Sequence, residues 1–282
     1  MRAILDAVPA VGSLDIQEMR RHAIESKRAW NDGADAGILR RSSVIDPGEI
    51  PVLYLAERGA EALPVVYLHG GGWSICNLDT HLSIFVDLAR ALGRPVWAPH
   101  PRQAPEHPYP APLDDVLLAM RSRQEKALQV CGDSAGANLV LAALLKARDA
   151  GRPLPVSAAV LFYGCYRRRF GTESHRKFGE GFGLTTDKMR RFWEMYVTSA
   201  GDYADLSQAD FKGLPPVQLH LASCDPLADD TRWLHARLQE DGVKAELVEW
   251  PGMAHGFLHY ALDLRPAREA FDTASRFLGS HA

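Results

Sequence analysis

The most informative stretch of this sequence is Gly132-Asp133-Ser134-Ala135-Gly136, which stands between the apolar run Leu128 to Cys131 and a helical pattern from Ala135 to Ala150. A serine with a glycine two residues away on each side forms the pattern G-x-S-x-G. Between a buried strand and a helix, this pattern indicates a sharp turn that holds the hydroxyl of Ser134 above the edge of a sheet. An ordinary glycine-rich turn is the alternative interpretation of the same residues.

Short β-rich runs alternate with helical patterns along most of the chain, which is typical of a mostly parallel sheet covered by helices on both faces. The expected strands are Pro51 to Ala56, Pro64 to Leu68, Pro95 to Pro99, Leu128 to Cys131, Ser157 to Tyr163, Val217 to Ser223 and Ala245 to Trp250. The expected helices between and after them are Thr80 to Leu92, Pro112 to Gln124, Ala135 to Ala150, Asp229 to Asp241 and Arg265 to Leu278, with Asp229 as an N-cap. The sequence therefore predicts the α/β fold class.

Two segments fall outside this alternation. An amphipathic helix is expected over Asp15 to Trp30, before the first strand, and a helical insertion is expected over Arg167 to Gly213. Together they predict a small helical cap over one end of the sheet. The expected division is an N-terminal cap segment (1–48), a first part of the α/β core (49–164), a cap insertion (165–213) and a second part of the core (214–282).

Composition excludes several classes of protein. The chain has 282 residues, 46% apolar and 24% charged, with a net charge of -3, so it lacks the basic excess expected of a protein that binds nucleic acid. No apolar run approaches the ~18 residues that span a bilayer, and Met1 to Gly12 is a poor secretory signal. Four dispersed cysteines indicate a reducing compartment, and we expect a cytoplasmic protein; they are Cys76, Cys131, Cys165 and Cys224.

A second glycine-rich stretch, His69-Gly70-Gly71-Gly72-Trp73, follows the strand that ends at Leu68. Consecutive glycines leave backbone N–H groups free to point at an oxygen atom. These residues predict an oxyanion hole formed by the N–H groups of Gly71, Gly72 and Ala135. A phosphate-binding loop and a plain flexible turn are the alternatives, although the residues that usually accompany a phosphate loop are missing.

A serine hydroxyl needs a base that removes its proton, and the base needs a third group that orients it. His255 follows the last expected strand, at the sheet edge where open parallel sheets place their sites, and we predict it as the base, with His259 as the fallback. Asp225 follows the preceding strand and is the predicted carboxylate. The alternative for Asp225 is a turn-forming Asp-Pro, and Asp229 and Asp230 are less favoured substitutes.

With these motifs in order, the chain resembles the α/β-hydrolase fold and, within it, the hormone-sensitive-lipase-like carboxylesterases. The resemblance covers the chain from about residue 50 to its end. It rests on the two glycine-rich motifs and on three further segments, Arg102-Gln103-Ala104-Pro105-Glu106-His107-Pro108-Tyr109-Pro110, Asp225-Pro226-Leu227-Ala228-Asp229 and His255-Gly256-Phe257. Pro101, Gln103 and Ala137 depart from the family's usual residues.

The resemblance implies a mostly parallel sheet with flanking helices, and a cap built from the N-terminal segment and an insertion after the sixth strand. It also implies hydrolysis of short or medium acyl esters through an acyl-enzyme on Ser134. This chemistry requires no metal and no organic cofactor. Amide, lactone or carbamate hydrolysis by the same residues remains open, as does a receptor for small molecules that uses a hydrolase fold without catalysis.

The substrate is the least determined feature. Aromatic and apolar residues of the cap and the catalytic loops are candidates to line an acyl pocket, although they fit the core of the cap equally well; they are Trp73, Phe182, Met189, Phe192, Trp193, Tyr196 and Phe257. A basic cluster indicates either a solvated surface or an attraction for acidic substrates; its members are Arg167, Arg168, Arg169, Arg176 and Lys177. The family often forms homodimers through the edge near the last strand, here Ala245 to Trp250.

Overall fold

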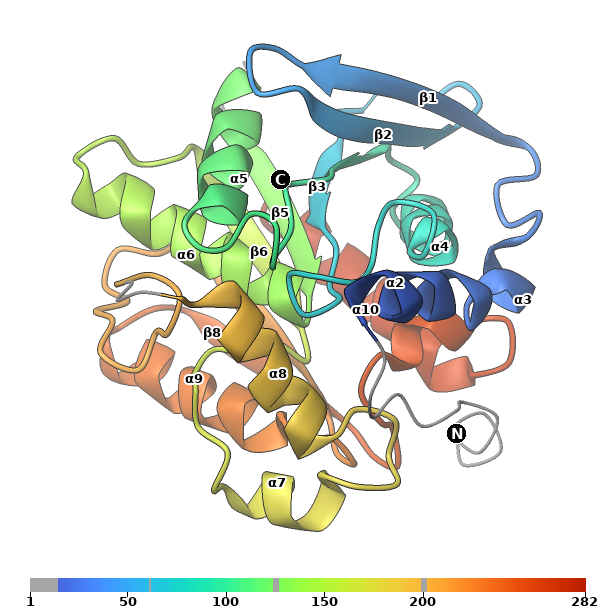
Figure 1. The fold of residues 1–282 in the computed structure, drawn as a ribbon. Coiled ribbons are helices and arrows are strands. Elements are labelled where there is room, and N and C mark those ends of the chain that lie inside the picture. The colour runs from blue at the N-terminus through green and yellow to red at the C-terminus, as the bar shows by residue number, and fades with distance from the viewer. Residues whose placement is uncertain (1–14, 61, 124–126, 199–201) are drawn as a thin grey trace.

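A computed structural model of the chain describes residues 15–60, 62–123, 127–198 and 202–282, and its centre is one eight-stranded sheet (Figure 1). The order across the sheet is β1-β2-β4-β3-β5-β6-β7-β8. The strands are β1 (Ile38–Ile45), β2 (Ile50–Glu57), β3 (Val65–Leu68), β4 (Val96–Pro99), β5 (Leu128–Asp133), β6 (Val156–Phe162), β7 (Val217–Ala222) and β8 (Ala245–Trp250). Strand β2 pairs antiparallel with β1 and with β4, and all the other pairs are parallel. The predicted α/β fold is confirmed.

Seven of the eight strands are those that the sequence predicts, within two residues at either end. The exception is β1, which lies in the segment assigned to the cap yet pairs with β2 along its whole length. Six of its eight residues are exposed, because it is an edge strand with no helix packed over it. It therefore lacks the apolar alternation from which strands are recognised in a sequence.

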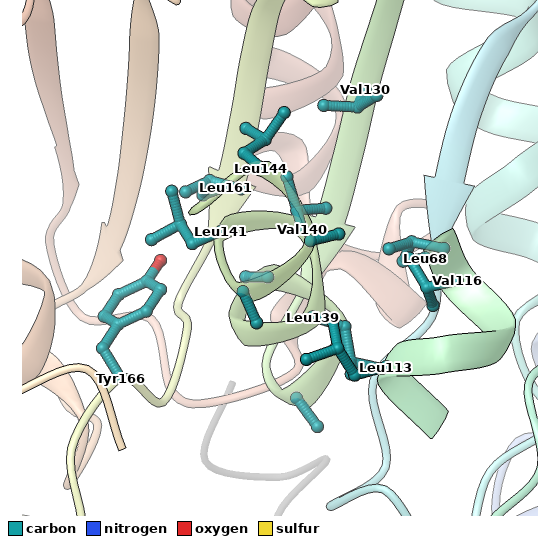
Figure 2. Close-up of a cluster of buried hydrophobic side chains, with 14 of the residues drawn as sticks. Leu68, Leu113, Val116, Val130, Leu139, Val140, Leu141, Leu144, Leu161 and Tyr166 are labelled. Atoms are coloured by element: carbon teal, nitrogen blue, oxygen red, sulfur yellow. The ribbon is translucent and has the colours of Figure 1, made fainter. Parts of the chain in front are cut away.

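Two helical layers enclose the sheet. One face is covered by α5 (Ala111–Ser122), α6 (Ala135–Asp149) and α9 (Ala228–Glu240), and the other by α4 (Leu82–Leu92) and α10 (Arg265–Gly279). Successive residues of a strand point to opposite faces of the sheet. In β3, Val66 and Leu68 pack in the cluster with α5 and α6, part of which Figure 2 shows. Val65 and Tyr67 pack in the cluster on the other face, with α4. Because both faces are buried, the central strands consist mostly of apolar residues.

The observed helices match the predicted ones closely, with one correction and one exception. The predicted N-cap Asp229 lies inside the first turn of α9, because the helix begins at Ala228 and its N-cap is Leu227. Gln124, where the sequence pattern ends α5, lies outside the described residues. Among the residues that the structure describes, no helix combines the length and the apolar character needed to cross a bilayer.

Helices outside the two layers come from the two segments expected to form a cap. The single helix expected over Asp15 to Trp30 is interrupted at Ser26 and Lys27, so the first segment contains two helices, α2 (Ile16–Glu25) and α3 (Arg28–Asn31). Helix α2 begins in a capping box between Asp15 and Glu18. The second contains α7 (Glu173–Phe178) and α8 (Thr186–Tyr196). Arg20 fixes α2 to the core through Glu106 at 2.7 Å, in the Arg102 to Pro110 segment. The N-terminal helices are thus attached to the same end of the sheet as the glycine-rich loops.

Candidate active site

Ser134 lies in the turn between β5 and α6, as its motif predicts. Its backbone has φ 52° and ψ -120°, a conformation that is costly for a residue with a side chain and is common at functional sites. The N–H of Ser134 donates to the carbonyl oxygen of Phe162 on β6 at 2.9 Å, which fixes the turn against the neighbouring strand. The backbone of the turn therefore places the hydroxyl at the N-terminus of α6.

The glycine at position 136 is required by space. A Cβ atom there would overlap with the carbonyl oxygen of Leu68, at the end of β3. Close approach of α6 to β3 is what brings the loop after β3, which contains the second glycine-rich motif, next to Ser134. The two glycine-rich motifs are therefore neighbours in space, because Gly136 has no side chain that would keep α6 away from β3.

His255 and Asp225 both reach Ser134 from the carboxyl ends of neighbouring strands. The Nε2 atom of His255 lies 2.9 Å from the Ser134 Oγ, and its Nδ1 lies 2.7 Å from the Asp225 Oδ2. Asp225 is fully buried, and its other carboxylate oxygen accepts the N–H of Leu227 at 2.8 Å. The structure therefore brings the three predicted residues together in one continuous hydrogen-bonded chain.

The fallback residues have other partners. His259 is buried edge-on against the ring of His81, with ring centroids 4.7 Å apart, and burial together with Lys27 holds its pKa well below the ordinary value. Asp230 forms an ion pair with Arg167 at 2.8 Å, and Asp229 accepts the N–H of Ser174 at 2.9 Å. In the described part of the chain, none of these three hydrogen-bonds to Ser134 or His255.

The glycine-rich loop after β3 is held in place by Asp133, the residue before the serine. Its carboxylate accepts the N–H of Gly70 at 2.9 Å and the hydroxyl of Tyr67 at 3.2 Å. Burial, together with the Asp133 charge, raises the pKa of Tyr67 well above its ordinary value, so this phenol stays a donor. The aspartate thus joins the serine turn to the glycine-rich loop.

The three predicted oxyanion donors lie at this junction. Gly71 and Gly72 line the same cavity as Ser134, and Ala135 is the first residue of α6. Within the described residues, their N–H groups have no hydrogen-bond partner in the protein. Gly72 has φ 58°, and a Cβ there would overlap with the ring of Phe192 on α8, so α8 packs directly onto this loop.

A cavity of about 190 Å³ opens onto Ser134 and His255. Of the predicted substrate-binding residues, Met189 and Phe192 line it. The others lie in packing clusters and are not part of its lining. Trp73 stacks on Tyr196 with centroids 4.2 Å apart and also packs against Trp193, whereas Phe182 packs against Phe178, and Phe257 against Tyr163 and Trp250.

Several residues that line the cavity are not predicted as site residues by the sequence analysis. They are Lys27, Ile75, Cys76, His81, Gly183, Leu184, Lys188 and Tyr260. Burial raises the pKa of the Cys76 thiol to about 11, so it remains protonated. Most come from the cap segments or from loops without a recognisable motif, so only the folded chain shows that they meet.

The predicted basic cluster does not form a single patch. Arg167 is buried with Asp230 and lies over the ring of Trp233, and Arg176 donates to the carbonyl oxygen of Gly171 at 2.7 Å. Lys177 forms an ion pair with Glu173. In the ranges that the structure describes, no group of three His, Cys, Asp or Glu side chains is placed to hold a metal ion.

Comparison with known proteins gives the context for this geometry. Residues 65–259 match a family described as having the alpha/beta hydrolase fold. The chain belongs to the α/β-hydrolase family. This α/β hydrolase is similar to the acetyl esterases of Salmonella agona and Salmonella typhi, each 32% identical over 286 residues that cover 95% of this chain and 88% of the relative.

Solved structures agree with these relatives. A bacterial esterase of the hormone-sensitive lipase family superposes with a TM-score of 0.91 at 27% identity, covering 99% of this chain and 96% of that one. An esterase of Pyrobaculum calidifontis superposes with a TM-score of 0.90 at 28% identity, with the same coverage. The expected resemblance is thereby confirmed, and this α/β hydrolase is a carboxylesterase-type enzyme.

Proposed function

We propose that this α/β hydrolase is a serine carboxylesterase that hydrolyses short to medium acyl esters through an acyl-enzyme on Ser134. The observation that carries the proposal is the hydrogen-bonded chain from the Ser134 Oγ through His255 to the Asp225 carboxylate, at 2.9 Å and 2.7 Å. Its order along the sequence, serine then aspartate then histidine, is the order typical of this fold. A receptor without catalysis would have no use for a complete chain of this kind.

In the proposed reaction, the Ser134 Oγ attacks the ester carbonyl carbon while the His255 Nε2 takes the hydroxyl proton. Asp225 orients the imidazole and stabilises its charged form. The tetrahedral oxyanion accepts hydrogen bonds from the N–H groups of Gly71, Gly72 and Ala135. His255 then protonates the leaving alcohol as the carbon–oxygen bond breaks. Water repeats the sequence on the acyl-enzyme, which releases the acid and restores the Ser134 hydroxyl.

The size of the cavity favours the short end of the substrate range. At about 190 Å³ it is smaller than the roughly 300 Å³ at which pockets for drug-sized ligands begin. Phe192 and Met189 of α8 line it, and Phe192 packs against Gly72 of the glycine-rich loop. The names of the Salmonella relatives, acetyl esterases, support the same choice. We therefore propose acetyl to butyryl esters as the preferred acyl range.

The test is the variant Ser134→Ala, with Ser122→Ala as a matched control on the exposed end of α5. We expect Ser134→Ala to lower turnover of p-nitrophenyl acetate by at least about 10⁴-fold, since the nucleophile is removed, and to abolish labelling by a fluorophosphonate probe. Ser122→Ala should behave as the wild type in both assays. Unchanged turnover by a correctly folded Ser134→Ala protein would disprove the role of this serine.

Three further expectations belong to the same proposal. The cap would consist of the segment before β1 and the insertion after β6, both of which contribute side chains to the cavity. A cytoplasmic setting is supported by the four cysteines, all of which are free thiols. A homodimer through β8 is supported by the position of that strand at the edge of the sheet.

A further inference from the structure

The cavity beside Ser134 carries two lysines from different parts of the cap. Lys27 lies between α2 and α3, and Lys188 lies in the first turn of α8, yet both side chains line the cavity together with Ser134 and His255. The charge of Lys27 acts on Lys188, whose pKa is lowered first by burial and then by this neighbouring ammonium. Two like charges therefore share a small, partly buried space.

Neither ammonium group is neutralised by the protein. Lys27 Nζ donates to the Tyr260 hydroxyl at 2.6 Å, and Lys188 Nζ donates to the carbonyl oxygen of Gly183 at 3.1 Å. Both acceptors are uncharged. Across the described ranges of the chain, no carboxylate lies within 4.0 Å of either lysine. Arg20 and Arg167, by contrast, each have an acidic partner.

The acidic groups that face the cavity are already engaged. Asp133, which lines the cavity, accepts hydrogen bonds from Gly70 and Tyr67 and lies 3.4 Å from the ring of His81. Asp225 lies behind His255, outside the cavity lining, and is paired with that imidazole. His259, on the same wall as Lys27, is kept uncharged by burial and by that lysine. Its Nδ1 has no hydrogen-bond partner in the part of the chain that the structure describes. The cavity thus has unmatched positive charge and a free polar atom.

Unpaired charges in a partly buried space are unfavourable unless a ligand compensates them. We propose that Lys27 and Lys188 bind a carboxylate of the substrate, so that the preferred esters are short esters that carry a second, ionised carboxyl group. This inference rests on the proposed esterase function. A carboxylate has two oxygens, and each can accept a hydrogen bond from one ammonium. The small cavity places this group within a few bonds of the scissile carbonyl.

The experiment compares charged esters with neutral esters of the same shape. Monomethyl succinate and methyl succinamate differ only in an acyl-side carboxylate or amide, and acetoxyacetate and acetoxyacetamide differ in the same way on the alcohol side. We expect kcat/KM to be at least about tenfold higher for the charged member of one pair, because hydrogen bonds to charged groups are stronger than neutral ones. The pair that shows the preference identifies the side of the ester on which the carboxylate lies.

Two variants connect this preference to the lysines. Lys27→Met and Lys188→Met keep the approximate length of each side chain and remove its charge. The ratio of kcat/KM between charged and neutral esters should fall about threefold to tenfold in each and reach about one in the double variant. The ratio within one variant cancels any general loss of activity or folding. Lys177→Met, at a lysine whose side chain is 61% exposed and outside the cavity, should leave the ratio unchanged.

The outcomes separate this inference from the proposed function. A wild-type enzyme that hydrolyses p-nitrophenyl acetate and is labelled at Ser134, but shows no preference for either charged ester, overturns the carboxylate site alone. A preference that persists in the double variant also overturns it. Failure of both labelling and hydrolysis of all the esters overturns the esterase proposal itself.

Discussion

Two buried aspartates, Asp225 and Asp230, lie five residues apart at the junction of β7 and α9, and they have different partners. Asp225 contacts the imidazole of His255, which can gain and lose a proton. Asp230 contacts the guanidinium of Arg167, which stays charged at every relevant pH, and also accepts the N–H groups of Tyr166 and Arg167. The first pair can take part in proton transfer, whereas the second can only hold the structure together.

The location of the two carboxylates explains why they have different partners. Asp225 directly follows the loop at the end of β7, on the edge of the sheet where Ser134 and His255 also lie. Asp230 lies in the first turn of α9 and faces the segment that leaves β6. Since Arg167 lies between β6 and α7, its pair with Asp230 attaches the segment after β6 to α9. Burial and charge alone would not have distinguished a catalytic carboxylate from a structural one.

The largest expected effect is that of Asp225→Asn on catalysis. The amide keeps the shape of the side chain but cannot stabilise a charged imidazole, so we expect kcat/KM for p-nitrophenyl acetate to fall by about 10³ to 10⁴-fold. The melting temperature should change by only a few degrees. Steady-state kinetics and a thermal melt check both. Asp229→Asn, four residues further on, is the matched control, and comparable losses in the two variants would remove the distinction between these carboxylates.

The second effect concerns stability and its dependence on pH. Burial raises the pKa of Asp230 to about 6, and Arg167 limits that rise. In Arg167→Met the buried carboxylate loses its partner, and we expect the free energy of unfolding to fall by about 3 kcal/mol at pH 8. The pKa of Asp230 should rise further in the variant, so that at pH 5 the carboxyl is neutral in the folded protein and the loss is smaller.

Urea unfolding of the wild type and Arg167→Met at pH 5 and pH 8 measures this difference. The direction follows from proton binding: a carboxyl whose pKa is higher in the folded protein binds more protons there than in the unfolded chain. Stability therefore falls as the pH rises between the unfolded value, about 3.9, and the folded value. An equal loss at both pH values would show that Arg167 acts through packing on Trp233 rather than through the charge of Asp230.

The sequence predicts the sheet edge better than the cap, for a physical reason. In a parallel sheet, the residue after each strand is placed at the same edge by the strand itself, so Ser134, Asp225 and His255 are recognisable from strand ends and turn residues. The glycines next to them are needed for close backbone contacts, which also makes them visible in the sequence. Local patterns suffice because the sheet determines the long-range geometry.

No comparable rule places the side chains of the helices in the two segments expected to form a cap, because no strand fixes their position. Lys27, between α2 and α3, and Lys188, in α8, are 161 positions apart, and the patterns of these helices show an apolar face but not what it packs against. The aromatic residues Trp73, Trp193 and Tyr196 have the composition of a binding pocket, yet they pack on one another between the glycine-rich loop and α8. Whether a given side chain lines a pocket or packs in a core depends on contacts between distant segments, and no spacing in the sequence encodes those contacts.

The smallest expected effect is that of Asp229→Asn, at the third aspartate of this junction. Asp229 is partly exposed, accepts the N–H of Ser174 at 2.9 Å, and contacts Arg232 at 3.1 Å. In Asp229→Asn the amide oxygen still accepts the Ser174 N–H, and only a surface ion pair is lost, so we expect the free energy of unfolding to fall by less than about 1 kcal/mol. Urea unfolding measures it, and kcat/KM should stay within about twofold of the wild type, because Asp229 has no contact with His255. A loss of 3 kcal/mol or more would mean that Asp229, rather than Asp230, anchors the cap insertion to α9, and the roles assigned to the two neighbours would have to be exchanged.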